Sequence, residues 1–285
     1  MTLNKIFKLF YGSLILFSTI LISESCTSRS GQAKLRRENS NQISKKVSPV
    51  KNEILEFRTN LAFYPTSTTN QIIDHTYFTV SYSEKDEQPE WVAYKITPDN
   101  IIKNVDRTND YRIDPSVKTK SASPKDYRGS GYDMGHLAPA RIMSSNSTSI
   151  SESFYLSNIS PQAPSFNRGI WRRLEGKVRY WAALNDSIYV VSGPVLDAPI
   201  ERIGKNNVNV PRSFYKTLLR FKGGKTKGIA FLMPNKKSDD SIYSYVISID
   251  SLEAITSINF YKELDSKLQN KLERNKSIKE FISNK

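Results

Sequence analysis

Histidine and cysteine are the scarcest reactive residues in this chain of 285 residues. Histidine occurs twice, as His75 and His136, and cysteine once, as Cys26. A single cysteine excludes an intrachain disulfide. One of the two histidines stands between Gly135 and a Leu-Ala-Pro turn, which favours a specific role for that imidazole. The chain also lacks internal repeats, and no break in composition divides residues 54–285, so we expect one domain there.

Positive charge is unevenly distributed along the chain. The formal net charge is +14, of which +6 falls in residues 27–51 and +7 in residues 52–285. The longer segment is therefore basic in its own right, which favours a polyanionic partner or an acidic surface. The alternative is that the lysines serve solubility alone.

The N-terminal segment predicts export. Residues 1–25 combine two lysines with an apolar run over residues 9–22, which is typical of a signal peptide and too short for a comfortable membrane span. Cys26 follows directly and resembles a bacterial lipoprotein processing site, although Glu24 is unusual there. We expect a periplasmic or cell-surface protein with a lipid on Cys26. The alternative is an ordinary signal peptide, an incidental cysteine and secretion.

The segment after the cysteine predicts a tether. Residues 26–53 are polar, basic and poor in aromatic residues, a composition typical of disorder.

Hydrophobic periodicity in the rest of the chain predicts secondary structure. We expect strands at residues 76–82, 91–96, 132–139, 188–192, 214–221, 228–233 and 243–249, helices near residues 151–155 and at 166–184 and 258–282, and loops at 103–131 and 156–162.

The stretch from residue 132 to residue 175 carries the candidate chemistry. It reads Y-D-M-G-H-L-A-P-A at 132–140, Y-L-S-N-I-S-P-Q at 155–162 and F-N-R-G-I-W-R-R-L-E at 166–175. Hydrolysis of a phosphodiester needs a base for water, a cation on the phosphate and donors for the developing negative charge. His136 can be that base.

Asn167 offers a neutral oxygen ligand suited to hydrated Mg²⁺. If the segment is helical, Glu175 lies ~12 Å further along the axis, at 1.5 Å per residue, and would orient metal-bound water instead of binding the ion. The same position of Asn167 also fits a helix N-cap, a common role for asparagine at the start of a helical pattern.

These motifs together resemble the DNA/RNA non-specific endonucleases, the ββα-metal or His-Me finger nucleases that include mitochondrial endonuclease G. Further motifs in the same order extend the resemblance over roughly residues 70–262: Q-P-E-W-V-A-Y at 88–94, V-S-G-P at 191–194, V-P-R-S-F-Y-K at 210–216 and F-L-M-P-N at 231–235. The resemblance implies an α+β fold, with a mainly antiparallel central sheet, flanking helices and a ββα-metal motif.

The resemblance also implies roles for individual residues. His136 matches the general base, Asn167 the direct Mg²⁺ ligand, Glu175 the residue that organises metal-bound water, and Arg107 the arginine that steadies the transition-state phosphate. The implied substrate-binding residues are Asp133, Asn158, Gln162 and Arg168. The family usually has an arginine where this chain has Met134, and Arg128, Arg141 or Arg168 could compensate.

The function implied is an exported endonuclease that uses Mg²⁺, with Mn²⁺ as a substitute, and cuts DNA and RNA with little sequence preference. One alternative, motivated by Met134, is a catalytically impaired surface protein that binds nucleic acid. Another is a protein whose basic tether and C-terminal helix bind anionic envelope components.

Overall fold

The computed structural model describes residues 63–283. The predicted signal peptide, Cys26, the basic tether and the expected start of order near Ile54 lie outside these residues. No helix within the described part of the chain is long and apolar enough to cross a membrane.

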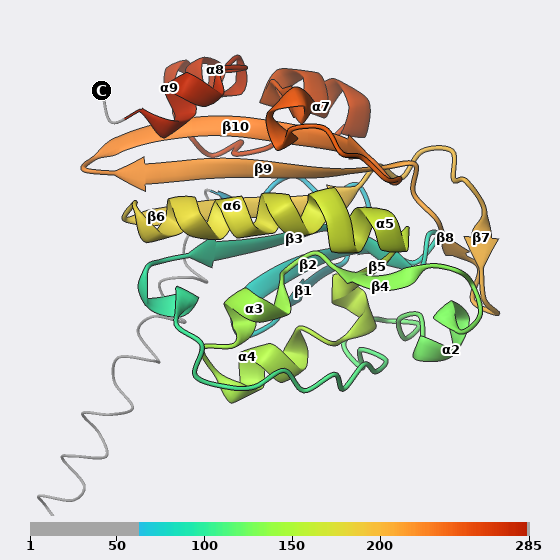
Figure 1. Ribbon diagram of the computed structural model, residues 1–285. Coiled ribbons are helices and arrows are strands. Elements are labelled where there is room, and N and C mark those ends of the chain that lie inside the picture. The colour runs from blue at the N-terminus through green and yellow to red at the C-terminus, as the bar shows by residue number, and fades with distance from the viewer. Residues whose placement is uncertain (1–62, 284–285) are drawn as a thin grey trace, which may run out of the picture. The chain divides into compact units, whose positions relative to one another are not determined.

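A seven-stranded antiparallel sheet forms the centre of the described chain (Figure 1). Its strands follow the order β1-β2-β3-β6-β9-β10-β11, so two three-stranded meanders, β1-β2-β3 and β9-β10-β11, flank strand β6. Central pairs include Val190 of β6 opposite Leu218 of β9. The strands are β1 (Ile72–Asp74), β2 (Phe78–Ser83), β3 (Gln88–Ile96), β6 (Ser187–Pro194), β9 (Ser213–Lys222), β10 (Lys225–Pro234) and β11 (Val246–Ile247).

Strand β9 shows how side chains divide between the two faces of the sheet, because successive residues of a strand point to opposite sides. Phe214 and Leu218 belong to the larger hydrophobic core, whereas Tyr215 and Leu219 belong to a second core on the other face. By the same alternation Lys216 and Arg220 point toward the larger core, although both are charged.

Helix α6 (Arg172–Ala183) covers the face of the larger core and lies in front of the sheet in Figure 1. Its buried residues Leu174, Val178 and Trp181 recur at helical spacing and join the strand side chains in that core. The second face is covered by α7 (Ile249–Thr256) and α8 (Ser266–Glu273). Helix α9 (Ile278–Ile282) returns to the larger core through Phe281.

Two short strands and a helix carry the predicted catalytic stretch. Strand β4 (Asp133–His136) pairs antiparallel with β5 (Ile159–Gln162), and α5 (Pro164–Phe166) leads into α6. Between β4 and β5 the chain forms α3 (Ala140–Met143), α4 (Ser147–Glu152) and η3 (Leu156–Asn158). The remaining small elements are η2 (Asp99–Ile101), α2 (Pro124–Tyr127), β7 (Arg202–Ile203), β8 (Val208–Asn209) and η5 (Ile242–Tyr245).

Several local predictions were wrong. The loop expected at residues 156–162 contains strand β5, whose regularity comes from pairing with the distant β4. The strand expected at 243–249 has only the two residues of β11, because Ser248 caps α7 and ends the extended segment. The helix expected at 258–282 begins only at Ser266, since Tyr261 adopts a positive φ of 59°, and it is two short helices, α8 and α9, which residues 274–277 separate.

His75 has a structural environment. Its side chain is buried, and its Nε2 atom lies 3.1 Å from Oδ2 of Asp114. The same carboxylate oxygen accepts a hydrogen bond of 2.5 Å from the hydroxyl of Ser157.

Candidate active site

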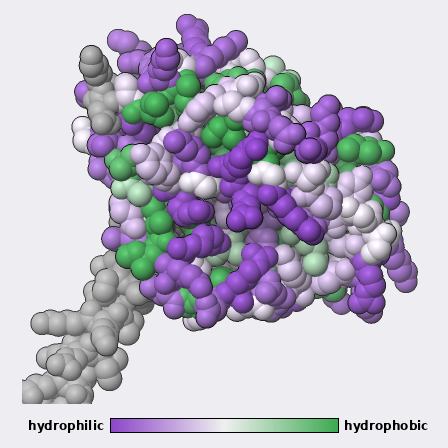
Figure 2. Space-filling model, viewed as in Figure 1, coloured by the Kyte–Doolittle hydropathy of each residue, from purple (hydrophilic) through white to green (hydrophobic). Residues whose placement is uncertain are grey.

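A pocket of about 970 Å³ opens between β4 and the N-terminal part of α6. The face that carries α6 is largely hydrophilic in Figure 2. Two acidic side chains, Asp133 and Glu175, line the pocket together with His136 and Asn167. Its cationic residues are all arginines: Arg107, Arg141, Arg168, Arg172, Arg173 and Arg179. Arginine binds phosphate through a planar fork of donors, so this lining suits a phosphate-rich ligand.

His136 ends strand β4 with its imidazole between aromatic rings. The ring centroids of Phe154 and Tyr111 lie 4.8 and 5.6 Å away, both edge-on. Burial, and to a smaller extent the charge of Arg107, lowers the pKa of His136 to about 3. Its Nε2 atom has no hydrogen-bond partner within the described residues. The imidazole is therefore neutral across the physiological pH range, which is the form that a general base requires.

The glycine beside this histidine is required by close packing. A Cβ atom on Gly135 would lie 2.2 Å from Oε1 of Gln162, much closer than atoms can approach. Gln162 is fully buried, and neither of its amide atoms has a hydrogen-bond partner within residues 63–283. Gln162 is therefore not among the residues that line the pocket, and its role in substrate binding stays a prediction.

Asn158 also lies behind the pocket and not in its wall. Its Oδ1 accepts a hydrogen bond of 2.8 Å from the amide of Ala138, and its Nδ2 donates to the carbonyls of Ala138 and Ser153 at 3.0 and 2.8 Å. The side chain is fully buried. These bonds give Asn158 a structural role, which is to hold the turn that follows His136, and its predicted contact with substrate stays a prediction.

Asp133 orients the predicted metal ligand. Its Oδ2 accepts a hydrogen bond of 2.9 Å from Nδ2 of Asn167, so the carbonyl oxygen Oδ1 of Asn167 is left without a partner among the described residues. Asn167 begins a π-helical segment, η4 (Asn167–Trp171), which contains the non-helical Gly169. The N-cap of α5 is Ala163, so the interpretation of Asn167 as an N-cap is wrong.

This environment fits a hydrated divalent cation. A neutral amide oxygen, turned into a pocket by an ionised neighbour and otherwise unpartnered, is a ligand that Mg²⁺ accepts while it keeps several waters. Arg168 completes the arrangement, because its Nη2 and Nε atoms donate to both oxygens of Asp133 at 2.6 and 2.8 Å. Arg168 lies at the pocket as predicted, but its first partner is Asp133.

Glu175 faces the same pocket from the first turns of α6. Burial raises the pKa of its carboxyl to about 7, against the opposing effects of Lys216, Arg179 and Arg107. Lys216 lies fully buried under this region, with Nζ 3.0 Å from the hydroxyl of Ser192 and 4.6 Å from the ring centroid of Trp171. Burial lowers the pKa of Lys216 to about 8.

Arg107 is held near His136 by polar and aromatic contacts. Its Nε donates to Oδ1 of Asn109 at 2.6 Å, its Nη2 donates to the hydroxyl of Tyr111 at 3.0 Å, and its guanidinium lies 4.8 Å from the ring centroid of Phe154. Because Phe154 and Tyr111 also contact His136, the aromatic pair places the base and this arginine together.

Met134 packs, together with Tyr111 and Tyr132, against a small hydrophobic cluster that includes Tyr127 and Leu156, and it also lines the pocket. Of the three arginines that could compensate for it, Arg141 and Arg168 line the pocket and Arg128 does not. Sequence analysis missed three further arginines of the pocket. Their spacing could have indicated this position, because Arg172 and Arg179 stand three residues before and four residues after Glu175 and so share its face of the helix. Arg173 stands beside them in the sequence.

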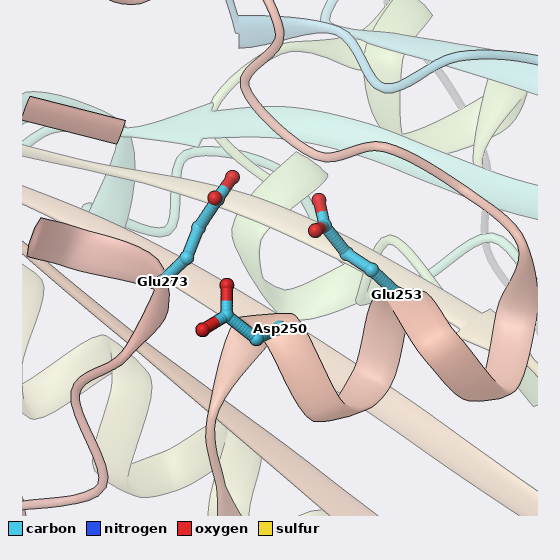
Figure 3. Close-up of side chains that lie close together, drawn as sticks. All are labelled: Asp250, Glu253 and Glu273. Atoms are coloured by element: carbon cyan, nitrogen blue, oxygen red, sulfur yellow. The ribbon is translucent and has the colours of Figure 1, made fainter. Parts of the chain in front are cut away.

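A second group of acidic residues lies away from the pocket (Figure 3). Asp250 and Glu253 of α7 and Glu273 of α8 bring carboxylate oxygens within 4.8 Å of one another. The amide of Phe260 donates to Glu253 at 2.7 Å, and Gln269 donates to Glu273 at 2.9 Å. Protein donors thus already partner two of the three groups, and we assign this cluster no ligand.

A histidine on a two-stranded ββ unit, facing an amide ligand on the helix that follows, is the arrangement of the ββα-metal nucleases. The family model for DNA/RNA non-specific endonucleases matches residues 60–267. The chain belongs to this family, and the predictions of family and fold class are confirmed.

Curated relatives agree with this assignment. Human mitochondrial endonuclease G is 32% identical over 215 residues, which are 70% of this chain and 72% of that protein. Mouse mitochondrial nuclease EXOG is 35% identical over 210 residues, 67% of this chain but only 57% of the relative. The crystal structure of the EndoG/EndoGI complex matches with a TM-score of 0.66 and 31% identity, covering 71% of this chain and 90% of the matched one.

Proposed function

We propose that this chain is a metal-dependent endonuclease that hydrolyses phosphodiester bonds of DNA and RNA without sequence preference. The observation that carries the proposal is that the candidate base, the candidate metal ligand and the arginines line a single pocket. A neutral His136, whose Nε2 has no hydrogen-bond partner within residues 63–283, lines the same pocket as six arginines and Asn167, whose Oδ1 likewise has no partner among the described residues. These groups supply the base, the metal ligand and the phosphate contacts that such hydrolysis needs.

In this mechanism His136 takes a proton from the attacking water. The lowered pKa keeps the imidazole neutral, and Phe154 and Tyr111 restrict the orientation of the ring. Arg107, fixed by Asn109 and Tyr111, binds the phosphate oxygens as negative charge develops on them.

Asn167 would hold a divalent cation through Oδ1, with Mg²⁺ the expected ion and Mn²⁺ a substitute. When bound, such an ion polarises the phosphate and stabilises the leaving oxygen. Asp133 keeps the carbonyl of Asn167 turned to the pocket, and the carboxylate of Glu175 orients water at the pocket wall.

The arginine lining also supports a substrate without sequence preference. Guanidinium groups bind the phosphates that every nucleotide carries, and such contacts hold no information about the bases. Arg172 and Arg179 have no hydrogen-bond partners among the described residues, so they are available to bind phosphates on either side of the cleaved bond.

The test is cleavage by the full-length chain, purified in detergent, beside His136→Ala. Plasmid DNA and total RNA are incubated with Mg²⁺, Mn²⁺ or EDTA, and fragments are sized. We expect the wild type to cut both, EDTA to abolish cutting, and His136→Ala to lower the rate by about 10²- to 10⁴-fold. Equal melting temperatures of the two proteins would exclude unfolding as the cause.

Two results would overturn the proposal. Cleavage that survives in His136→Ala would move the chemistry to another site or to a contaminant. No cleavage by the wild type in any divalent cation, with salt-sensitive binding of nucleic acid retained, would favour the catalytically impaired binding protein, and Met134→Arg would then be the next variant.

We also propose that the chain is exported and lipid-anchored through Cys26. The proposal rests on the apolar run of residues 9–22 and the cysteine that follows it. Metabolic labelling with a radioactive fatty acid should mark the wild type but not Cys26→Ser, and the variant should leave the membrane fraction. Deletion of residues 27–51 should leave nuclease activity intact, whereas a protein whose main role is binding the envelope through its tether would lose its function.

A further inference from the structure

A second pocket, of about 390 Å³, lies along the C-terminal half of α6; we name it the α6 C-terminal pocket. The two pockets share one helix but lie on different sides of it, because Arg179 lines the first and its neighbour Tyr180 the second. Segments far apart in the sequence complete it. Its lining includes Lys177 and Tyr180 of α6, Arg220 and Lys222 of β9, Tyr243 of η5 and Phe281 of α9.

The lining of this pocket contains three cations and no acid. Arg220 is the most informative, since its side chain is only 3% exposed. Its guanidinium donates to the backbone carbonyls of Ile282 and Ser283, and its Nε has no partner within the described residues. Lys222 likewise donates to a carbonyl, that of Leu184, at 2.8 Å. A buried cation without a carboxylate is costly, so this lining favours an anionic ligand.

Exposed aromatic rings stand among these cations. Tyr180 is 55% exposed and Tyr243 is 41% exposed, although large rings usually bury most of their surface. The Nζ atom of Lys177 lies 4.6 Å from the ring centroid of Tyr180 and 5.9 Å from that of Trp181. The hydroxyl of Tyr180 makes no hydrogen bond within residues 63–283, so no polar contact accounts for its outward position. Cations interleaved with open ring faces are typical of surfaces that bind single-stranded nucleic acid.

We propose that the α6 C-terminal pocket is a second nucleotide subsite, in which a base of the bound strand stacks on Tyr180 and its phosphate contacts Lys177 and Lys222. The inference rests on the proposed function for the identity of the ligand, a single-stranded stretch of the polynucleotide held in the active-site pocket. Continuity of charge supports this occupant, because Arg172 and Arg179 of the first pocket lie on the helix that carries Lys177 and Tyr180.

The distance between the two pockets sets the length of strand required. Tyr180 stands five residues after Glu175, ~7.5 Å along the helix axis at 1.5 Å per residue, and a strand must also pass the helix, about 10 Å across. At ~3.4 Å per nucleotide this takes about four or five nucleotides. Substrates of two nucleotides should therefore reach only the active-site pocket, while longer ones reach both.

The test is oligonucleotide binding by the full-length chain in EDTA, which separates binding from cleavage. Fluorescein-labelled oligothymidylates of two and of about twelve nucleotides are titrated with wild type, Tyr180→Ala, Tyr180→Phe and Lys177→Gln. We expect Tyr180→Ala to weaken binding of the longer probe at least about fivefold and leave the shorter one unchanged. Tyr180→Phe keeps the ring and should bind as the wild type does.

Lys205→Gln is the matched control for lost charge, because this exposed lysine lines neither pocket. Equal affinity of wild type and Tyr180→Ala for the longer probe would overturn the subsite. Equal loss for both probes would overturn it too, since the effect would then belong to the first pocket or to folding. Binding of thymidine monophosphate as tight as that of the longer probe, and dependent on Tyr180, would instead indicate a site for free nucleotides.

These results are separable from a failure of the proposed function. A wild type that cuts plasmid DNA but binds the longer probe independently of Tyr180 would refute the subsite alone. A wild type that does not cut, but whose binding depends on Tyr180, would refute the nuclease activity alone. In an active enzyme, Tyr180→Ala should raise KM for the longer substrate at least about fivefold, with kcat unchanged.

Discussion

The carboxylate of Asp133 and the amide of Asn167 are joined by a hydrogen bond of 2.9 Å, from Nδ2 of the asparagine to Oδ2 of the aspartate. An ionised carboxylate can only accept, so it binds the amino end of the asparagine and directs the carbonyl end elsewhere. The residue one position further, Arg168, occupies the rest of the carboxylate. Asp133 thus orients both a candidate metal ligand and a phosphate-binding cation.

Asp133→Ala should weaken binding of Mg²⁺ or Mn²⁺ about 10- to 100-fold, as loss of a residue that orients a metal ligand commonly does. Isothermal titration calorimetry of the two proteins measures the change. Asp197→Ala removes an exposed aspartate that does not line the active-site pocket and should leave the affinity unchanged. Unaltered metal binding in Asp133→Ala would show that Asn167 needs no such orientation.

Metal binding should release a proton near neutral pH. Because burial raises the pKa of Glu175 to about 7, its carboxyl is protonated below that pH and ionised above it. A nearby cation favours the ionised form, so affinity should fall as the pH is lowered from 8 to 6. Calorimetry in two buffers with different ionisation enthalpies counts the protons. In Glu175→Gln both the proton release and this pH dependence should disappear.

Gly135→Ala should destabilise the fold by about 1–3 kcal/mol, since the new Cβ atom would overlap the side chain of Gln162. Urea denaturation measures the change in the free energy of unfolding. The double variant with Gln162→Ala should recover part of the loss. As a control, Gly176→Ala meets no atom closer than 3.9 Å and lies inside α6, so it should stabilise the fold by about 0.5–1 kcal/mol.

The acidic cluster should make stability depend on pH. Burial raises the pKa of Glu253 to about 7, and Glu273 and Asp250 add to the effect. A raised pKa in the folded state means that the contribution to stability is full below about 4.5 and is lost as the pH rises through 7. The melting temperature of Glu253→Gln should therefore rise relative to wild type between pH 5 and pH 8. A constant difference across that range would contradict the raised pKa.

Much of the sheet and the main helix could be predicted from local pattern. Alternating residues over 76–82 and 214–221 and helical spacing over 166–184 match β2, β9 and the α5–α6 segment, because burial on one face imposes a period of two or 3.6. Strand β5 was missed because its four residues include Pro161 and depend on pairing with β4. Helix α7 was missed because its eight residues begin at a cap inside an apolar run.

The sequence by itself determined the family, through several motifs in one order, and with it the candidate roles of His136, Asn167, Glu175 and Arg107. It also located the excess of positive charge. These conclusions depend on residue identity and spacing, which the chain carries in one dimension. Export and lipidation remain predictions from residues outside the described structure.

Only the tertiary structure decided which of those residues meet. It buried Asn158 and Gln162 behind the pocket, paired Arg168 with Asp133, and brought three further arginines of α6 to the site. It also assembled the α6 C-terminal pocket from residues 177–282. The physical reason is that hydrogen bonding, burial and the resulting pKa shifts depend on neighbours distant in sequence, which no local pattern encodes.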